Sequence, residues 1–112
     1  MKIAIPMAGD KLSLHFGHCE KFALLEANPD TKEIVNVDYV DAPPHQPGLL
    51  PRWIKDQGVN LVIAGGMGHK AISLFNQLGI EVIVGAPADK PENIILAYLN
   101  GTLQTGQNVC DH

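Results

Sequence analysis

Residues 61–79, LVIAGGMGHKAISLFNQLG, contain the pattern that decides the fold. The apolar run from Leu61 to Ala64 is typical of a short buried strand, and the glycine turn Gly65-Gly66-Met67-Gly68 follows it directly. Beyond the turn, apolar side chains three or four residues apart predict a helix that ends at Gly79: Ala71, Ile72, Phe75 and Leu78. A strand, a tight turn and a helix in this order are typical of an α/β fold with parallel strands.

The alternation continues toward the C-terminus. Glu81 to Val84 is predicted to form a further strand, and a last helix ends before Gly101. The spacing of Asp89 and Glu92 predicts a capping box at the start of that helix, with Pro91 in its first turn. The apolar face of the helix is Ile94, Ile95, Tyr98 and Leu99.

The N-terminal half instead predicts an antiparallel meander of three strands, at residues 2–6, 22–26 and 34–40. Pro6 is expected to end the first strand, and a polar loop follows it. A proline-rich loop leads to a helix from Leu49 to Gly58. The resulting order, βββαβαβα, predicts an α/β protein with a five-stranded mixed sheet and helices packed on it, which resembles the ribonuclease H-like fold. A nuclease of that fold needs an acidic cluster anchored on the first strand, and residues 2–7 contain no acid.

Composition predicts one ordered globular domain, since the 112 residues are 46% hydrophobic and 18% charged. The net charge of -4 disfavours nucleic acid as a partner. No run approaches the roughly 18 apolar residues of a membrane span, and the apolar start is too short for a signal peptide, so a cytoplasmic protein is expected. In a reducing cytoplasm, Cys19 and Cys110 are expected to be core residues or ligands rather than a disulfide.

The segment His15-Phe16-Gly17-His18-Cys19 places three potential metal ligands within five residues. If it forms a helical turn, His15, His18 and Cys19 share one face and can reach one metal centre. The alternative is that Phe16 and Cys19 are buried in the core and the histidines are surface groups. The residues alone leave both interpretations open.

The glycine turn offers backbone N–H groups at a helix N-terminus, an arrangement that suits an anion. Gly66 to Ala71 also matches the dinucleotide fingerprint G-x-G-x-x-A. However, the next strand ends at Val84-Gly85 without the acidic residue that binds a ribose, so no nucleotide is expected. A tight strand-to-helix turn without a ligand is the alternative.

Other candidate metal ligands are dispersed along the chain. His45 lies in the proline-rich loop and His69 at the glycine turn, where it can instead cap a helix. Cys110 and His112 lie at the C-terminus, outside any recognisable motif. The chain has no C-x-x-C pair, H-E-x-x-H motif or G-x-S-x-G elbow, so neither a closed zinc site nor a serine hydrolase has direct support.

Residues 2–6, 15–22, 61–68 and 83–85 together resemble the dinitrogenase iron-molybdenum cofactor biosynthesis family. The most specific parts are the His-Phe-Gly loop with Phe22 after it and the Gly-Gly-Met-Gly turn. The resemblance covers about residues 1–103 as one domain and leaves 104–112 as an expected flexible tail. The family includes NifX- and NafY-like carriers, the C-terminal part of NifB and the short orange protein.

The resemblance implies a carrier or insertion protein for a preformed molybdenum- and/or iron-sulfur cluster, without enzymatic activity. Metallocluster donor and recipient proteins are then the expected partners of a monomer or weak dimer. A regulatory module that binds a small molecule, or a nucleotide or phosphate, is the alternative function. The cofactor-binding residues predicted for a carrier are His15, Gly17, Gly65, Gly66, Met67 and Gly68. The predicted metal ligands are His15, which the resemblance implies first, and His18, Cys19, His45, His69, Cys110 and His112.

Overall fold

A computed structural model of the chain describes residues 1–43 and 48–107, except for the side chain of His18. The strands are β1 (Lys2–Ala8), β2 (Lys11–Leu12), β3 (Lys21–Asn28), β4 (Glu33–Asp41), β5 (Leu61–Ile63) and β6 (Glu81–Ile83). The helices are α1 (Leu49–Asp56), α2 (His69–Gln77) and α3 (Pro91–Leu99), with a short 3-10 helix, η1 (Phe16–His18). None of the described helices has both the length and the apolar character needed to span a bilayer.

The strands form one mixed sheet in the order β4-β3-β1-β5-β6. β1 pairs antiparallel with β3, and β3 with β4, so the predicted meander is confirmed. β5 lies parallel to both β1 and β6, which confirms the parallel half that the strand–helix alternation predicts. The mixed α/β class is therefore correct.

The predicted count of five strands misses β2, and the sheet has six strands within the described residues. Gly9 adopts a left-handed backbone, with φ of 65°, and the chain folds back so that Leu12 and Lys11 pair with Met7 and Ala8. β1 also continues through Pro6, which was expected to end it and instead lies opposite Phe22 in the antiparallel ladder. This return places the segment after β2 directly over the end of the sheet.

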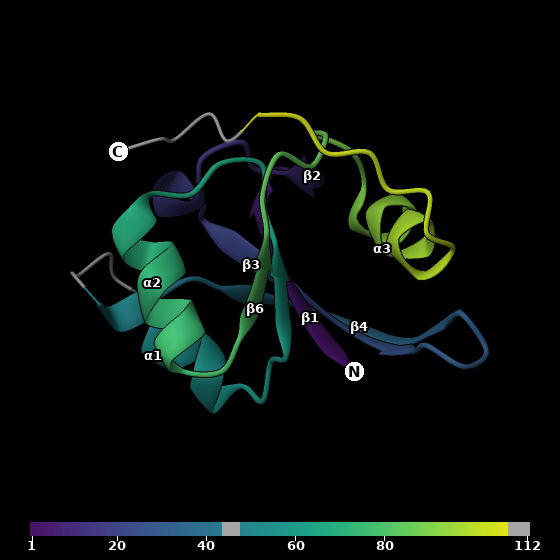
Figure 1. Cartoon of the computed structure of the whole chain (residues 1–112), viewed down its shortest axis with the longest axis horizontal. Helices are drawn as coiled ribbons and strands as arrows, with labels where there is room; N and C mark the ends of the chain where they lie inside the picture. Colours follow the sequence, from purple (N-terminus) through teal and green to yellow (C-terminus); the bar gives the residue numbers. More distant parts are fainter. Residues whose placement is uncertain (44–47, 108–112) are drawn as a thin grey trace.

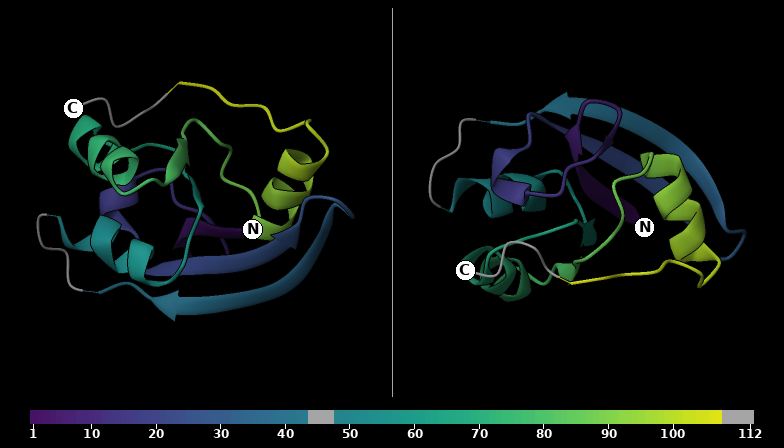
Figure 2. Two further views of the ribbon diagram at one scale, coloured as in Figure 1. Left: turned by 60° about the horizontal axis from the view of Figure 1, so that its bottom comes forward. Right: turned by 90° about the horizontal axis from the view of Figure 1, so that it is seen from above.

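The helices cover both faces of the sheet, with α1 and α2 on one side and α3 on the other (Figure 1, Figure 2). Alternate side chains of the strands face opposite helices, so the sheet supports two hydrophobic clusters. Ile54 of α1 and Phe75 of α2 belong to the first cluster, and Ile94 and Ile95 of α3 belong to the second. Phe16 of η1 belongs to the first cluster, where its ring contacts Phe75 with a centroid separation of 5.6 Å.

The start of α3 differs from the predicted capping box. Lys90 is the N-cap, and the Asp89 carboxylate instead accepts hydrogen bonds from the Lys90 backbone N–H at 2.7 Å and from the Asn93 side chain at 3.2 Å. These bonds lower the pKa of Asp89. Glu92 accepts a hydrogen bond from the Tyr39 hydroxyl at 3.0 Å, so it joins α3 to β4 rather than closing the cap.

Candidate functional site

Three loops meet at the edge of the sheet where β1, β5 and β6 end. Since these strands are parallel, their carboxyl ends face the same edge, which is the usual ligand side of an α/β sheet. We call residues 13–20 the histidine loop, residues 64–68 the glycine turn and residues 84–90 the β6 loop. This edge is uppermost in Figure 1.

Backbone hydrogen bonds join the glycine turn to the other two loops and β2 to the β6 loop. The Phe16 N–H of the histidine loop donates to the Gly66 carbonyl of the glycine turn at 3.0 Å. Gly85 of the β6 loop donates to the Gly65 carbonyl at 2.8 Å, and Leu12, just before the histidine loop, donates to the Asp89 carbonyl at 2.9 Å. The Phe16–Gly66 bond thus brings the histidine loop and the glycine turn together.

His15 lies at the exposed side of this junction, and the buried Ser13 fixes its backbone. The Ser13 hydroxyl donates to the His15 carbonyl at 3.0 Å and accepts from the His15 N–H at 3.2 Å. The backbone on either side of the imidazole is therefore held by bonds to Ser13 and to the glycine turn. Sequence reasoning did not identify Ser13, because serine after a strand is common and its burial depends on the unpredicted β2.

Gly65 is buried because the histidine loop packs directly on it. A Cβ atom at this position would lie 2.9 Å from the Leu14 Cα, closer than real Cβ atoms approach backbone. Gly65 is thus required for the contact between the two segments. Its predicted part in cofactor binding stays a prediction, and its packing alone explains why glycine is present.

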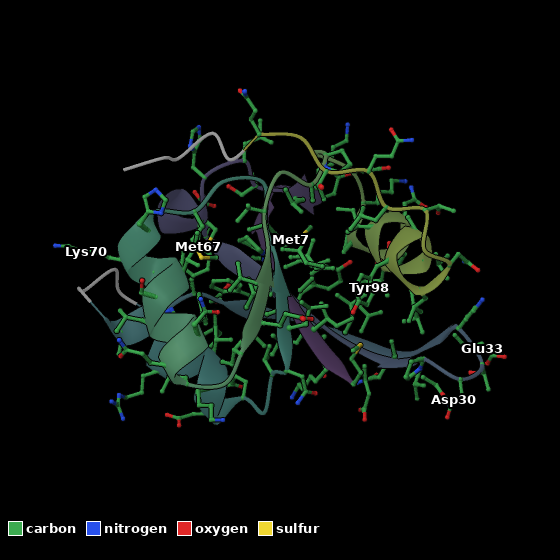
Figure 3. All side chains as sticks on the ribbon, in the orientation of Figure 1. Met7, Asp30, Glu33, Met67, Lys70 and Tyr98 are labelled. Carbon is green, nitrogen blue, oxygen red and sulfur yellow. The ribbon has the colours of Figure 1, made fainter. Side chains whose placement is uncertain are left out.

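Met67 and Gly68 occupy different environments within the glycine turn. The Met67 side chain is fully buried in the first cluster, and Figure 3 shows it directed inward whereas Lys70 points outward. No part of Met67 is therefore exposed to a ligand in this conformation. Gly68 is the N-cap of α2, in an extended conformation with φ of -69° and ψ of 156°.

His69 is the first residue of α2, directly after the N-cap residue Gly68, and it is exposed. The N-terminal end of a helix carries partial positive charge, which favours an anion near His69. A shallow depression continues along the same helix from His69 past Lys70, Ser73 and Leu74.

Cys19 is 1% exposed and belongs to the first hydrophobic cluster. Burial raises the pKa of its thiol to about 11, so the sulfur is protonated at neutral pH. His15 and Cys19 have extended backbones and flank a 3-10 helix of only three residues, so the shared helical face does not form. The alternative interpretation of Phe16 and Cys19 as core residues is the one that the structure supports.

The remaining predicted ligands lie outside the described part of the chain: the side chain of His18, and His45, Cys110 and His112. Among the residues that are described, no three His, Cys, Asp or Glu side chains are grouped so that they could hold a metal ion. His15, Gly17 and His69 are exposed, and they lie on the two segments that the Phe16–Gly66 bond joins. The described site therefore offers two imidazoles and a helix N-terminus.

Known proteins are similar to this chain in sequence and in fold. The family model described as dinitrogenase iron-molybdenum cofactor matches residues 1–101. The uncharacterized protein MJ0580 of Methanocaldococcus jannaschii is 38% identical over 109 residues, which cover 93% of this chain and 90% of that protein. The crystal structure of PH0822 is 33% identical, covers 96% of both chains and superposes with a TM-score of 0.88.

A more distant structure shares the fold alone. The apo form of the orange protein from Desulfovibrio gigas is 19% identical, with a TM-score of 0.72, and the match covers 96% of this chain and 93% of that one. These matches agree with the mixed α/β fold, and the family model covers the histidine loop and the glycine turn together. This chain belongs to the dinitrogenase iron-molybdenum cofactor family.

Proposed function

We propose that this protein is a cytoplasmic carrier that binds an anionic metal-sulfur cluster and passes it from a donor to a recipient protein, without catalysing a reaction. The observation that carries the proposal is the hydrogen bond from the Phe16 N–H to the Gly66 carbonyl. It joins the histidine loop, with His15, to the glycine turn that precedes α2. The cluster, containing molybdenum and/or iron, is the cargo of this site. Its binding residues are then His15, Gly17 and Gly68, the half-buried end of the glycine turn, with His69 beside them.

The chemistry of the site suits a cargo that must be released. Imidazole is a borderline donor that binds iron and other transition metals, and two such side chains leave most of a cluster's ligand positions to its own sulfides. The N-terminal end of α2 favours the negative charge of the cluster. Weak, partial ligation of this kind permits transfer to a recipient that offers a fuller ligand set.

The direct test is anaerobic loading of the purified protein. We expect the chain, after incubation with ferrous iron and tetrathiomolybdate and removal of excess reagent, to retain molybdenum and sulfide and to show charge-transfer absorption in the visible range. Bovine serum albumin treated in parallel controls for adventitious adsorption. A protein that remains colourless and metal-free, both after this loading and after anaerobic purification from its native host, would contradict the carrier proposal.

A phosphate-binding regulatory module is the second candidate, and the depression on α2 is the observation that favours it. Lys70 and Ser73 line this depression near the helix N-terminus, a combination that can bind a phosphate. Such a module should gain thermal stability with phosphate or nucleotides, by mass action, and should stay colourless with metal and sulfide. Differential scanning fluorimetry with both sets of compounds separates the two functions.

A further inference from the structure

β4 leaves one edge of the sheet open. It is the first strand in the order β4-β3-β1-β5-β6, so no strand among the described residues pairs with its outer side. Figure 2 shows β4 at the margin of the sheet. With nine residues it is the longest of the described strands, so its outer side offers a long row of backbone groups.

One hydrogen bond at the end of β4 shows which backbone groups face outward. The Ala42 N–H donates to the Glu20 carbonyl at 2.9 Å, so the backbone of Ala42 faces β3. The direction alternates from residue to residue along an antiparallel ladder, and the register with β3 is regular over residues 36–41. The residues whose N–H and C=O groups face the free edge are therefore Val37, Tyr39 and Asp41.

The sequence of β4 does not block an added strand. Natural sheet edges are commonly blocked by proline, by lysine or by a bulge. Residues 33–41 contain neither proline nor lysine, and the bulge lies near the N-terminal end of β4, opposite Glu26 and Ala27. The Tyr39 side chain is 54% exposed, so an aromatic ring lies beside the open backbone groups. Residues 36–41 can thus pair with an extended segment of another molecule.

The charges of β4 select the kind of segment that can bind. All its charged side chains are acidic and exposed: Glu33, Asp38 and Asp41. Lys21 of β3 lies opposite Asp41 and offsets that charge, whereas Asp38 lies opposite the apolar Leu24. A second copy of this chain would bring the same acids to the junction, and like charges on facing strands destabilise pairing. A segment with lysine or arginine is instead attracted to them.

The C-terminal end of β4 lies beside the candidate site. Glu20, whose carbonyl accepts the bond from Ala42, is the last residue of the histidine loop. A segment paired with Asp41 would lie two strand spacings from β3, or about 10 Å. A partner that docks on β4 is therefore placed next to the loop that carries His15.

We propose that the outer edge of β4 binds an extended, basic segment of a partner protein as a further strand of the sheet. The backbone groups of Val37, Tyr39 and Asp41 bond to the backbone of the partner, and Asp38 attracts its lysine or arginine side chains. Docking at this edge needs no cargo, so it goes beyond the carrier function and can be tested without it. In a carrier, it would hold the donor or the recipient beside the histidine loop.

The test uses the full chain without cargo, and its probe is a capped peptide of alternating lysine and valine. We expect the peptide to slow hydrogen exchange of the Tyr39 amide at least tenfold, measured by NMR, because it gives this outward N–H a partner. The Val40 amide faces β3 and should be protected without the peptide. A peptide of alternating glutamate and valine should bind at least tenfold more weakly.

Charge variants test the selection of a basic partner. Asp38→Lys should weaken binding of the lysine peptide at least fivefold, and the isosteric Asp38→Asn at least twofold, with melting temperatures close to that of the parent. Glu81→Lys is the matched control, because Glu81 is an exposed acid on β6 at the opposite edge of the sheet. It should bind the peptide as the parent does.

The other outcomes overturn the proposal. A Tyr39 amide that exchanges freely at saturating peptide would mean that the edge adds no strand. Equal binding of the two peptides, or equal weakening by Asp38→Lys and Glu81→Lys, would remove the role of Asp38. A peptide-free protein that sediments as a dimer with a protected Tyr39 amide would assign the edge to a second copy of this chain. None of these results bears on cluster binding, because no cluster is present.

Discussion

His15 is the side chain whose removal tests the candidate site most directly. We expect His15→Ala to weaken cluster binding at least tenfold, equivalent to about 1.4 kcal/mol, because the imidazole is exposed beside the glycine turn. The melting temperature should change little, since a truncation at an exposed loop position leaves the core intact. Anaerobic titration and a melting curve on the same sample measure both effects.

Asn76→Ala is a suitable control, because Asn76 is exposed on α2 near the end remote from the glycine turn. It should bind the cluster as the parent does. A His15→Ala variant that loses more than about 1 kcal/mol of stability, with binding reduced only in proportion to unfolding, would instead make His15 a structural residue.

The buried Cys19 thiol makes a prediction about pH. Burial raises its pKa to about 11, above the value near 8.5 of an unfolded cysteine. A group whose pKa is raised on folding contributes stability below its unfolded pKa and loses it as the pH rises through its folded pKa. The free energy of unfolding should therefore fall by about 2 kcal/mol more in the parent than in Cys19→Ala between pH 8.5 and pH 11. Urea unfolding at a series of pH values measures the difference, and parallel curves for the two proteins would refute it.

The sequence identifies the histidine loop but not the roles of its individual residues. Cysteine and histidine occur both as ligands and in cores, so the spacing of His15 and Cys19 leaves both roles open. Burial separates them, because Phe16 and Cys19 turn into the core and His15 remains exposed. That outcome depends on contacts with α2 and β3, which no local pattern encodes.

At the level of elements, the contact between the histidine loop and the glycine turn depends on Gly65. Gly65→Ala would place a Cβ atom 2.9 Å from the Leu14 backbone, so either the loop or the turn must shift. We expect a loss of about 1–3 kcal/mol in stability, the usual cost of overpacking, together with weaker cluster binding. Chemical denaturation measures the first effect and anaerobic titration the second.

Gly17→Ala is the matched control for this experiment. Gly17 lies in the same loop, but a Cβ atom there would meet nothing within 4 Å. Its stability should therefore stay within about 0.5 kcal/mol of the parent. Equal stabilities for the two variants would mean that the packing of Leu14 on Gly65 does not matter.

The elements missed by sequence analysis are those set by tertiary contacts. β2 has only two residues, so it shows no periodicity, and it exists because Gly9 returns the chain along β1. Asp89 and Glu92 have the spacing of a capping box, yet the helix begins one residue later and Glu92 bonds to Tyr39 of β4. The Tyr39 hydroxyl, which is distant in the sequence, takes the Glu92 carboxylate that the capping box would use. The spacing of two residues along the chain cannot indicate such a contact.

At the scale of the whole molecule, the α/β class was predictable because strand and helix patterns alternate from residue 61 onward. The histidine loop follows β2, which runs antiparallel to β1, and the Phe16–Gly66 bond brings this loop to the glycine turn. The hydrogen bond from the Gly106 N–H to the Gly85 carbonyl was not predicted. Two glycines 21 residues apart in the sequence do not indicate that their backbones meet, because that contact depends on the fold.

We expect the fold of this protein not to depend on metal. Both faces of the sheet carry a complete hydrophobic cluster, and each is built from strands and at least one helix. Within the described residues, no buried side-chain nitrogen or oxygen lacks a hydrogen-bond partner, so nothing there requires a metal to satisfy it. Removing a bound cluster should thus take away only the stabilisation that binding itself provides.

We therefore expect the apo protein, after anaerobic treatment with EDTA and desalting, to melt in one cooperative transition. Its melting temperature should match that of protein purified without metal. The loaded protein should melt higher, by an amount that grows with cluster concentration. Proteins whose metal is structural unfold when it is chelated. Loss of the cooperative transition on chelation would place a structural metal in this chain and would make the site something other than a releasable carrier site.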